Sequence, residues 1–216
     1  MTETINASDV ANVIQPGFRV FVQGGVGEPR TILEALSVDA GRPVPAEGKA
    51  VEYLSASIPG INSAMAADKL HSGAHLYSTF LHPGLGAGDA HRCISFLPLH
   101  YRDTFRFLQS ATRLAAAIIQ VTPPDGDGYC SLGISLDFVP AILDKCDCII
   151  AEVNPQMPAP AASPKIPLTA IHFRVDVDHA LPCSTAADPG PTELAIAHNV
   201  ASLVDDGSCI QIGIGK

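Results

Sequence analysis

Short apolar runs bounded by Gly, Pro or Asp recur along the chain, and they predict β-strands. The expected strands cover 18–24, 51–56, 75–80, 94–97, 116–121, 148–153 and 209–214. The runs at 115–119 and 148–151 are apolar at every position, which is typical of parallel strands covered on both faces. A buried parallel sheet is therefore expected to form the centre of the fold.

Helical segments are expected between these strands. They cover 28–36, with a Pro in the first turn, 101–110, 136–145 and 192–204. The fold class is therefore α/β, with an open, mostly parallel sheet flanked by helices. Five prolines between 154 and 167 indicate a loop or extended arm, and the alternating residues at 173–178 predict a half-buried edge strand.

Composition narrows the functional classes. The 216 residues include 13 Lys and Arg against 22 Asp and Glu, a formal charge of −9, which argues against a nucleic-acid-binding protein. Hydrophobic residues make up 47% of the chain and charged residues 16%, which excludes a disordered chain. No apolar stretch approaches the ~20 residues of a membrane helix. Six cysteines without C-x-x-C spacing and a polar N-terminus favour a cytoplasmic, disulfide-free protein.

Glycines mark two strand ends where a ligand could approach the backbone. Gly24, Gly25 and Gly27 lie between a strand and a helix, although their spacing fits neither a dinucleotide-binding nor a Walker motif. An ordinary tight turn is the alternative explanation for them. Gly213 and Gly215 form a second Gly-x-Gly turn after the strand expected at 209–214. Ligand sites in α/β proteins lie in the crevice beyond such strand ends.

Polar side chains also follow the strand expected at 148–153. Glu152 and Asn154 lie at the carboxyl end of this strand, where polar side chains would point into the same crevice. Capping of the next turn is an equally good explanation for Asn154.

Other chemistries lack a matching motif. His71 and His75 have metal-ligand spacing for a helix, but no H-E-x-x-H pattern includes them, so no metal site is predicted. Ser131 and Ser135 do not lie in G-x-S-x-G, which leaves a hydrolase triad without support. The Asp-Gly pairs at 125–128 predict a reverse turn or hairpin.

Five blocks in order resemble the N-terminal half of the acetyl-CoA hydrolase/transferase family, which includes 4-hydroxybutyrate, acetate and succinate CoA-transferases. The blocks lie at 20–36, 117–133, 149–158, 196–204 and 206–215. The more specific ones contain Thr122-Pro123-x-Asp125-x-x-Gly128-Tyr129-x-Ser131-Leu132-Gly133, Asn154-x-x-Met157-Pro158 and Asp206-Gly207-Ser208-Cys209. Together the blocks cover nearly the whole chain.

The resemblance implies an enzyme of two similar α/β halves that transfers coenzyme A between an acyl-CoA and a small carboxylate, as in acetate metabolism. A glutamate of the C-terminal half would attack the thioester and become a glutamyl-CoA thioester. That glutamate lies in a His-Thr/Ser-Glu-Met type segment, which none of the seven glutamates here matches. No catalytic residue is therefore assigned. The N-terminal domain is expected over 1–207, and 208–216 as the first strand and Gly turn of a C-terminal domain.

The substrate-binding residues implied are Gly24, Gly25, Gly27, Asn154, Gly213 and Gly215. Coenzyme A is expected as a substrate, with no tightly bound cofactor or metal. The expected partners are acyl-CoA, a small carboxylate, and a C-terminal domain or partner subunit; the chain alone is expected to be inactive and to form a homo-oligomer such as a dimer. The alternatives are a non-catalytic binding or assembly subunit, or an acyl-CoA hydrolase that uses Glu152.

Overall fold

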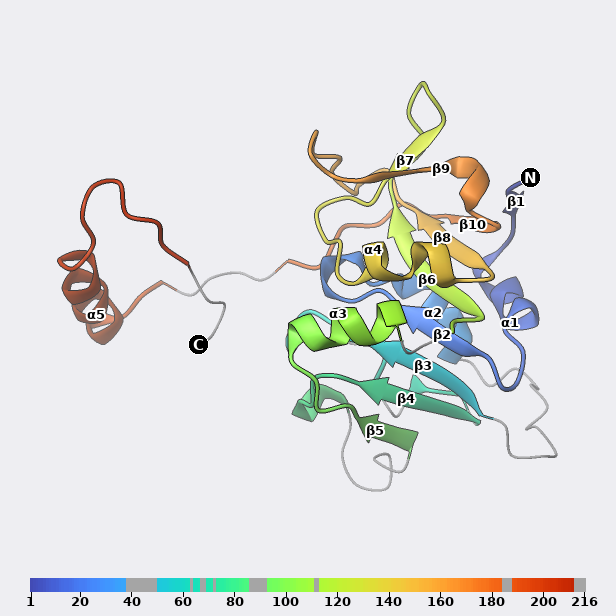
Figure 1. Ribbon diagram of the computed structural model, residues 1–216, viewed down its shortest axis with the longest axis horizontal. Coiled ribbons are helices and arrows are strands. Elements are labelled where there is room, and N and C mark those ends of the chain that lie inside the picture. Colours follow the sequence, from blue (N-terminus) through green and yellow to red (C-terminus); the bar gives the residue numbers. More distant parts are fainter. Residues whose placement is uncertain are drawn as a thin grey trace. The chain divides into compact units, whose positions relative to one another are not determined.

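Figure 1 shows the computed structural model, which describes residues 1–37, 50–62, 64–66, 69–71, 73–85, 93–110, 113–183 and 188–211. The chain forms two compact units, Met1–Cys183 and Ser184–Lys216. This division comes earlier than the boundary expected at 207. The interpretation of 208–216 as the start of a further domain stays a prediction.

An eight-stranded sheet forms the centre of the first unit (Figure 1). Every neighbouring pair in it is parallel, so the predicted α/β class with a mostly parallel sheet is confirmed. In spatial order its strands are β1 (Glu3–Thr4), β10 (Phe173–Asp176), β8 (Ile149–Val153), β6 (Ala116–Val121), β2 (Arg19–Val22), β3 (Val51–Ser55), β4 (Ala74–Ser78) and β5 (Ile94–Phe96).

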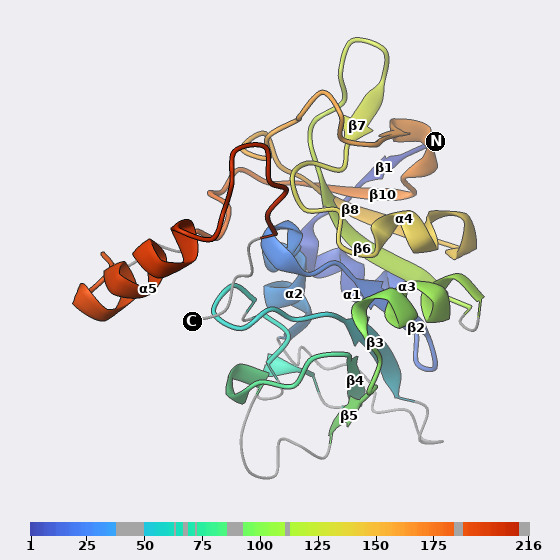
Figure 2. The same ribbon diagram turned by 60° about the vertical axis from the view of Figure 1, so that its left-hand side comes forward.

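Helices cover both faces of this sheet. Helices α1 (Val10–Val13) and α2 (Arg30–Ser37) contribute to one apolar cluster, and α3 (Tyr101–Ser110) and α4 (Val139–Ile142) contribute to the other. In Figure 1 the second pair lies in front of the sheet, and Figure 2 shows the same arrangement turned. The unit is therefore a three-layer α/β/α structure.

The continuous apolar runs explain these two clusters. All six residues of β6 are buried. Successive side chains of a strand point to opposite faces, and an apolar cluster covers each face of this sheet. Ala116 and Ile118 join the cluster on the α1 and α2 side, whereas Ala117 and Ile119 join the cluster on the α3 and α4 side. Strands covered on both faces need apolar residues at consecutive positions, as the sequence indicated.

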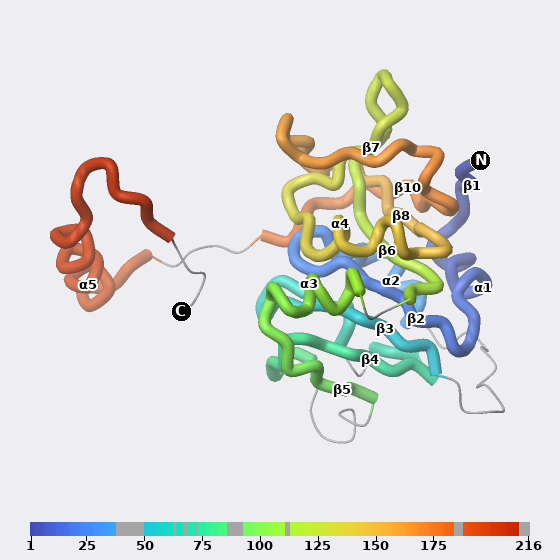
Figure 3. The backbone as a smooth tube through the Cα atoms, in the orientation of Figure 1, coloured from blue at the N-terminus to red at the C-terminus, as the bar shows by residue number. Residues whose placement is uncertain are grey.

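The prediction of an edge strand at 173–178 is wrong in its position. Strand β10 lies between β8 and β1, and its residues Phe173 and Arg174 pair with Glu3 and Thr4. Figure 3 shows the N-terminal segment beside β10. Because β1 is only two residues long, it covers β10 incompletely, and the half-buried pattern of β10 persists.

A small antiparallel sheet accounts for the Asp-Gly turn and the proline-rich arm. Strand β7 (Tyr129–Ser131) pairs with β9 (Lys165–Pro167), which belongs to the arm that was expected to be extended. The Asp125 carboxylate closes the turn by accepting hydrogen bonds from the N–H groups of Asp127 and Tyr129, at 3.1 and 2.9 Å. The extended arm and the turn are both confirmed.

The second unit contains helix α5 (Pro191–Ala201), which matches the helix expected at 192–204. No residue of α5 is buried. Residues 209–211 form no strand where one was expected at 209–214, and 212–216, including Gly213 and Gly215, lie outside the described residues. A strand needs a hydrogen-bonding neighbour, and the described part of this unit contains none. Of the helices that the structure describes, none is long and apolar enough to cross a membrane.

Candidate functional site

The strand order places a crevice at the carboxyl ends of β2 and β6. From β2 the chain continues through β3, β4 and β5 on one side of the sheet, and from β6 it continues through β8 and β10 on the other. The connections that leave β2 and β6 therefore diverge. Ligands of open α/β sheets bind at such a switch point.

Glycines are required in the turn that leaves β2, which includes the short helix η2 (Gly25–Gly27). A Cβ atom on Gly24 would lie 2.4 Å from the carbonyl oxygen of Ala56, and one on Gly25 would lie 2.6 Å from Ser135 Oγ. Gly25 also has a φ of +62°, in the left-handed region. The turn therefore packs backbone against the neighbouring loops, as the tight-turn explanation expects.

An open pocket of about 350 Å³ lies beside this turn. Its volume is within the range of small-molecule sites. Its lining comes from the turn after β2, the loop after β3, the start of α3 and the segment before α4, and consists of Gly25, Ala56, Ile58, Tyr101, Ser135, Leu136 and Asp137. The Tyr101 ring packs on Phe138 with ring centroids 4.5 Å apart. This pocket is the candidate substrate site.

Asp137 is the acidic group of the pocket. Its Oδ2 accepts a hydrogen bond from the N–H of Gly24 at 2.8 Å, and its backbone adopts a left-handed φ of +46°. Burial raises its pKa to about 6, although hydrogen bonds from the N–H groups of Gly24 and Phe138 oppose the shift. Burial, and then the charge of Asp137, raise the pKa of the Tyr101 hydroxyl. The pocket thus holds a carboxyl group that titrates close to neutral pH.

Gly27 packs over a network of buried amides. A Cβ atom at this position would lie 2.4 Å from Gln23 Nε2. Gln23 Nε2 donates to the carbonyl oxygen of Ser135 at 2.6 Å, and Gln23 Oε1 accepts from the N–H of Gln120 at 2.7 Å. Gln120 Nε2 donates to the carbonyl oxygen of Glu28 at 3.0 Å. This network joins the turn after β2 to β6 and to the segment before α4.

Asn154 belongs to the same network and is fully buried. Its Nδ2 donates to Gln120 Oε1 at 3.0 Å and to the carbonyl oxygen of His179 at 2.9 Å. Its Oδ1 accepts from the N–H of Gln156 at 3.1 Å, which is the turn-capping arrangement considered from the sequence. A contact between Asn154 and a ligand stays a prediction.

Glu152 is also fully buried, on the α2 side of the sheet. Its Oε1 accepts from the N–H of Ile32 at 2.6 Å, in the first turn of α2, and its Oε2 lies 3.3 Å from His179 Nε2. Burial raises the pKa of Glu152, while the Ile32 N–H and His179 act in the opposite direction. The carboxylate therefore caps a helix, and a hydrolase in which Glu152 attacks a substrate gains no support from this geometry.

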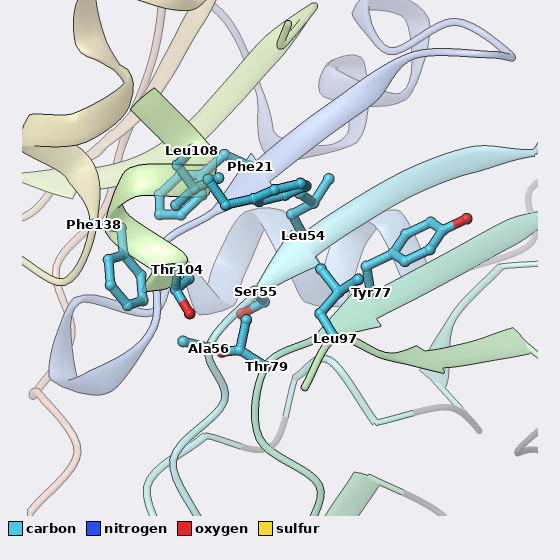
Figure 4. Close-up of a pocket in the computed structure, with 11 residues that line it drawn as sticks. Phe21, Leu54, Ser55, Ala56, Tyr77, Thr79, Leu97, Thr104, Leu108 and Phe138 are labelled. Atoms are coloured by element: carbon cyan, nitrogen blue, oxygen red, sulfur yellow. The ribbon is translucent and has the colours of Figure 1, made fainter. Parts of the chain in front are cut away.

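A second cavity lies beneath α3 and is apolar. Phe21, Leu54, Leu97, Leu108 and Phe138 are among the side chains that surround it in Figure 4. Its volume is about 10 Å³, which corresponds to one water molecule. It is a packing gap of the core and too small for a substrate.

The two histidines with metal-ligand spacing have other partners. His71 Nε2 lies 3.1 Å from the Tyr53 hydroxyl, and His75 Nε2 lies 2.8 Å from Ser95 Oγ. Within the described ranges no three His, Cys, Asp or Glu side chains gather in a way that could hold a metal ion.

The structure brings four of the predicted site residues to one region, and the other two, Gly213 and Gly215, lie outside the described residues. Gly24 and Gly25 lie at the pocket, while Gly27 and Asn154 connect to its rear through the amide network. Sequence reasoning missed Asp137 and Tyr101, because both lie in segments that predict ordinary helices. A weak signal was available, since an Asp directly before an apolar helix often marks a helix start.

The family described as "Acetyl-CoA hydrolase/transferase N-terminal domain" matches residues 2–172. The chain is 37% identical over 109 residues to the 4-hydroxybutyrate coenzyme A transferase of Clostridium kluyveri, covering 50% of this chain and 25% of that protein. It is 26% identical over 207 residues to the succinyl-CoA:cyclohexane-1-carboxylate CoA transferase of Geobacter metallireducens, covering 96% of this chain and 46% of that protein.

Solved structures share the fold. The crystal structure of RipA from Yersinia pestis is similar with a TM-score of 0.83 and 21% identity, covering 99% of this chain and 51% of that chain. The 4-hydroxybutyrate CoA-transferase of Porphyromonas gingivalis is similar with a TM-score of 0.67 and 24% identity, covering 99% and 48%. The chain thus spans about half the length of these proteins or less. With its family match over residues 2–172, the chain belongs to the acetyl-CoA hydrolase/transferase family.

Proposed function

We propose that this chain is the N-terminal half of a CoA-transferase that moves coenzyme A between an acyl-CoA and a small carboxylate. The observation that carries the proposal is the pocket beside Gly24 and Gly25, at the switch point of a sheet that belongs to this family. The named relatives transfer coenzyme A. The pocket would hold the acyl group or the acceptor acid. Coenzyme A would be a substrate of the reaction and not a tightly bound cofactor.

The nucleophilic glutamate is expected from a C-terminal half. Glutamyl-CoA chemistry requires a carboxylate that can reach the thioester carbonyl and displace the thiolate of coenzyme A, which gives a mixed anhydride. The thiolate then attacks the glutamyl carbonyl of this anhydride, which releases the donor's acid as a free carboxylate and leaves a glutamyl-CoA thioester. No glutamate is among the described residues that line the pocket. Glu152 is fully buried against Ile32 and His179. The reactive carboxylate would therefore enter the pocket from another part of the enzyme.

A C-terminal half would also cover apolar surface of the second unit. Ile196, Val200 and Ile210 are 57%, 56% and 62% exposed. These side chains, from α5 and the segment after it, surround one hollow, and contiguous exposed apolar surface often marks a protein–protein contact. The lengths of the relatives, of which this chain covers 46% or less in the two alignments above, support a further half as the partner. A homo-oligomer and a cytoplasmic location stay predictions.

Reconstitution tests the proposal. Residues 1–216 are purified alone and are also co-expressed with the C-terminal half encoded by the same or a neighbouring gene. CoA transfer from acetyl-CoA to butyrate is then measured, and borohydride is added after acyl-CoA to reduce any glutamyl thioester to an alcohol that mass spectrometry locates. We expect turnover and trapping only when both halves are present. Rapid transfer by residues 1–216 alone would contradict this division of roles.

A further inference from the structure

A carboxylate is held at the wall of the candidate pocket by contacts that fix its position. Asp137 Oδ2 lies 2.8 Å from the N–H of Gly24, and the left-handed φ of +46° sets the direction in which the side chain leaves the backbone. Asp is among the few residues other than Gly that adopt this conformation readily. Ser135 and Leu136, on the same segment, also line the pocket. The Asp137 carboxylate therefore has a fixed position in the pocket wall.

No cationic side chain neutralises this carboxylate among the described residues that line the pocket. The other titratable side chain of the lining is Tyr101, whose raised pKa keeps its hydroxyl protonated at neutral pH. His82 lies in the segment after β4, with its Nε2 3.1 Å from the Oγ of Ser57 on the loop after β3, and burial lowers the pKa of this imidazole. His82 is therefore neutral above its ordinary titration range. Among the described residues that line the pocket, the charge of Asp137 is therefore met by backbone N–H groups.

The rest of the lining suits an uncharged chain. Ala56, Ile58 and Leu136 supply apolar surface, and Ser135 and Tyr101 supply hydroxyl groups. A hydrocarbon or hydroxylated tail gains contacts with this wall, whereas a second carboxylate would be placed beside Asp137 without a cation. Like charges brought together in a partly desolvated site discriminate strongly against the wrong ligand.

We propose that Asp137 is a specificity-determining residue, whose carboxylate makes this pocket favour acids with an uncharged tail over acids that carry a second anionic group. The proposal rests on the proposed function, because it concerns the acyl or acceptor acid of that reaction.

The test uses the full-length enzyme and two acceptor acids that differ only in charge. Succinate and succinamate have nearly the same size, but the second carboxylate of succinate is an amide in succinamate. With acetyl-CoA as donor at pH 7.5, we expect kcat/KM for succinamate to exceed that for succinate by about tenfold or more. Asp137→Asn should bring the ratio close to one. Asp144→Asn, which removes an exposed carboxylate beyond α4, should leave the ratio of the wild type unchanged.

A pH series on the wild-type enzyme keeps the test decisive if Asp137→Asn does not fold. The sulfonate of 3-sulfopropanoate stays anionic at all the pH values used, so its rejection relative to succinamate should weaken as the pH falls through about 6 and Asp137 becomes protonated. A ratio that is the same from pH 5 to pH 8, or a ratio unaffected by Asp137→Asn, would overturn the inference. Absence of CoA transfer to every acceptor would instead overturn the proposed function, and the inference with it.

Discussion

At the scale of single residues, the pocket depends on backbone segments that approach each other closely. Gly24 donates its N–H to Asp137 while its Cα faces the carbonyl oxygen of Ala56. There is no space between them for a methyl group, because the added Cβ would lie 2.4 Å from that oxygen. Gly24 is therefore required for packing, even though its φ of −102° is open to any residue.

Substitution of Gly24 tests this requirement. We expect Gly24→Ala to lower the free energy of unfolding by about 1–3 kcal/mol, because the turn must move away from Ala56 or strain its backbone. CoA transfer by the full-length enzyme should fall as well, since the same movement displaces Gly25 in the pocket wall. Chemical denaturation and steady-state kinetics measure the two effects.

Gly126→Ala is the matched control for this substitution. A Cβ atom at Gly126 would meet nothing within 4 Å, so we expect a change of less than about 0.5 kcal/mol. Equal destabilisation by the two substitutions would show that the contact with Ala56 is not the cause.

The raised pKa of Asp137 predicts a pH dependence of stability. Its pKa is about 6 in the folded protein against 3.8 for an ordinary Asp, so between these values the folded state binds more protons than the unfolded state. Stability attributable to this group is therefore greatest below pH 4 and falls as the pH rises to about 6. Asp137→Asn removes this titration, so the mutant should gain up to about 3 kcal/mol relative to the wild type between pH 4 and pH 7. Urea denaturation across this range measures the gain; a constant difference would contradict it.

At the scale of elements, a buried carboxylate on β8 positions helix α2. Glu152 accepts the N–H of Ile32, one of the donors in the first turn that lack a partner within the helix. Negative charge is also favourable at a helix N-terminus. The capping group comes from a strand far away in the sequence, so the contact joins the helix to the centre of the sheet.

Two substitutions of Glu152 separate a capping role from a catalytic one. We expect Glu152→Ala to cost about 2–4 kcal/mol of stability, because it leaves the Ile32 N–H without an acceptor and opens a cavity. Glu152→Gln keeps a carbonyl oxygen for that N–H and should cost less. CoA transfer by folded Glu152→Gln should stay within about threefold of the wild type. Loss of transfer in a Glu152→Gln protein of unchanged stability would assign Glu152 to the reaction.

Local patterns were sufficient to predict most elements of the first unit, and long-range contacts explain where they failed. The strand expected at 116–121 has the observed bounds, and its apolar residues at 116–119 are typical of a parallel strand covered on both faces. The helix expected at 136–145 begins only at Val139, since Asp137 adopts a left-handed conformation and bonds to Gly24. The residues next to Asp137 in the sequence cannot predict this hydrogen bond, because its donor lies 113 residues away.

The candidate site was predicted in part for the same reason. The turn at Gly24 and Gly25 is visible as a strand followed by glycines, whereas the pocket wall around Asp137 exists only once β2 and β6 are neighbours. Gly133 is another example. A Cβ atom there would lie 2.3 Å from Met157 Sδ, so two separate family blocks meet in one contact.

At the scale of the whole molecule, both apolar clusters lie within the first unit. Every buried residue of the two clusters precedes Pro191, and the last of them is Val175. The first unit therefore has an apolar core of its own, which predicts that it folds without the second unit.

Truncation after Cys183 tests whether the first unit folds without the second. We expect residues 1–183 to fold cooperatively, with a midpoint of unfolding within about 2–4 °C of the value for residues 1–216, because a change below ~1 kcal/mol shifts a domain of this size by no more than that. Removal of exposed Leu194, Ile196, Val200 and Leu203 should also reduce self-association, which analytical ultracentrifugation measures. Non-cooperative unfolding of the truncated chain would show that α5 and its neighbours stabilise the sheet, and would place the boundary nearer to the predicted position at 207.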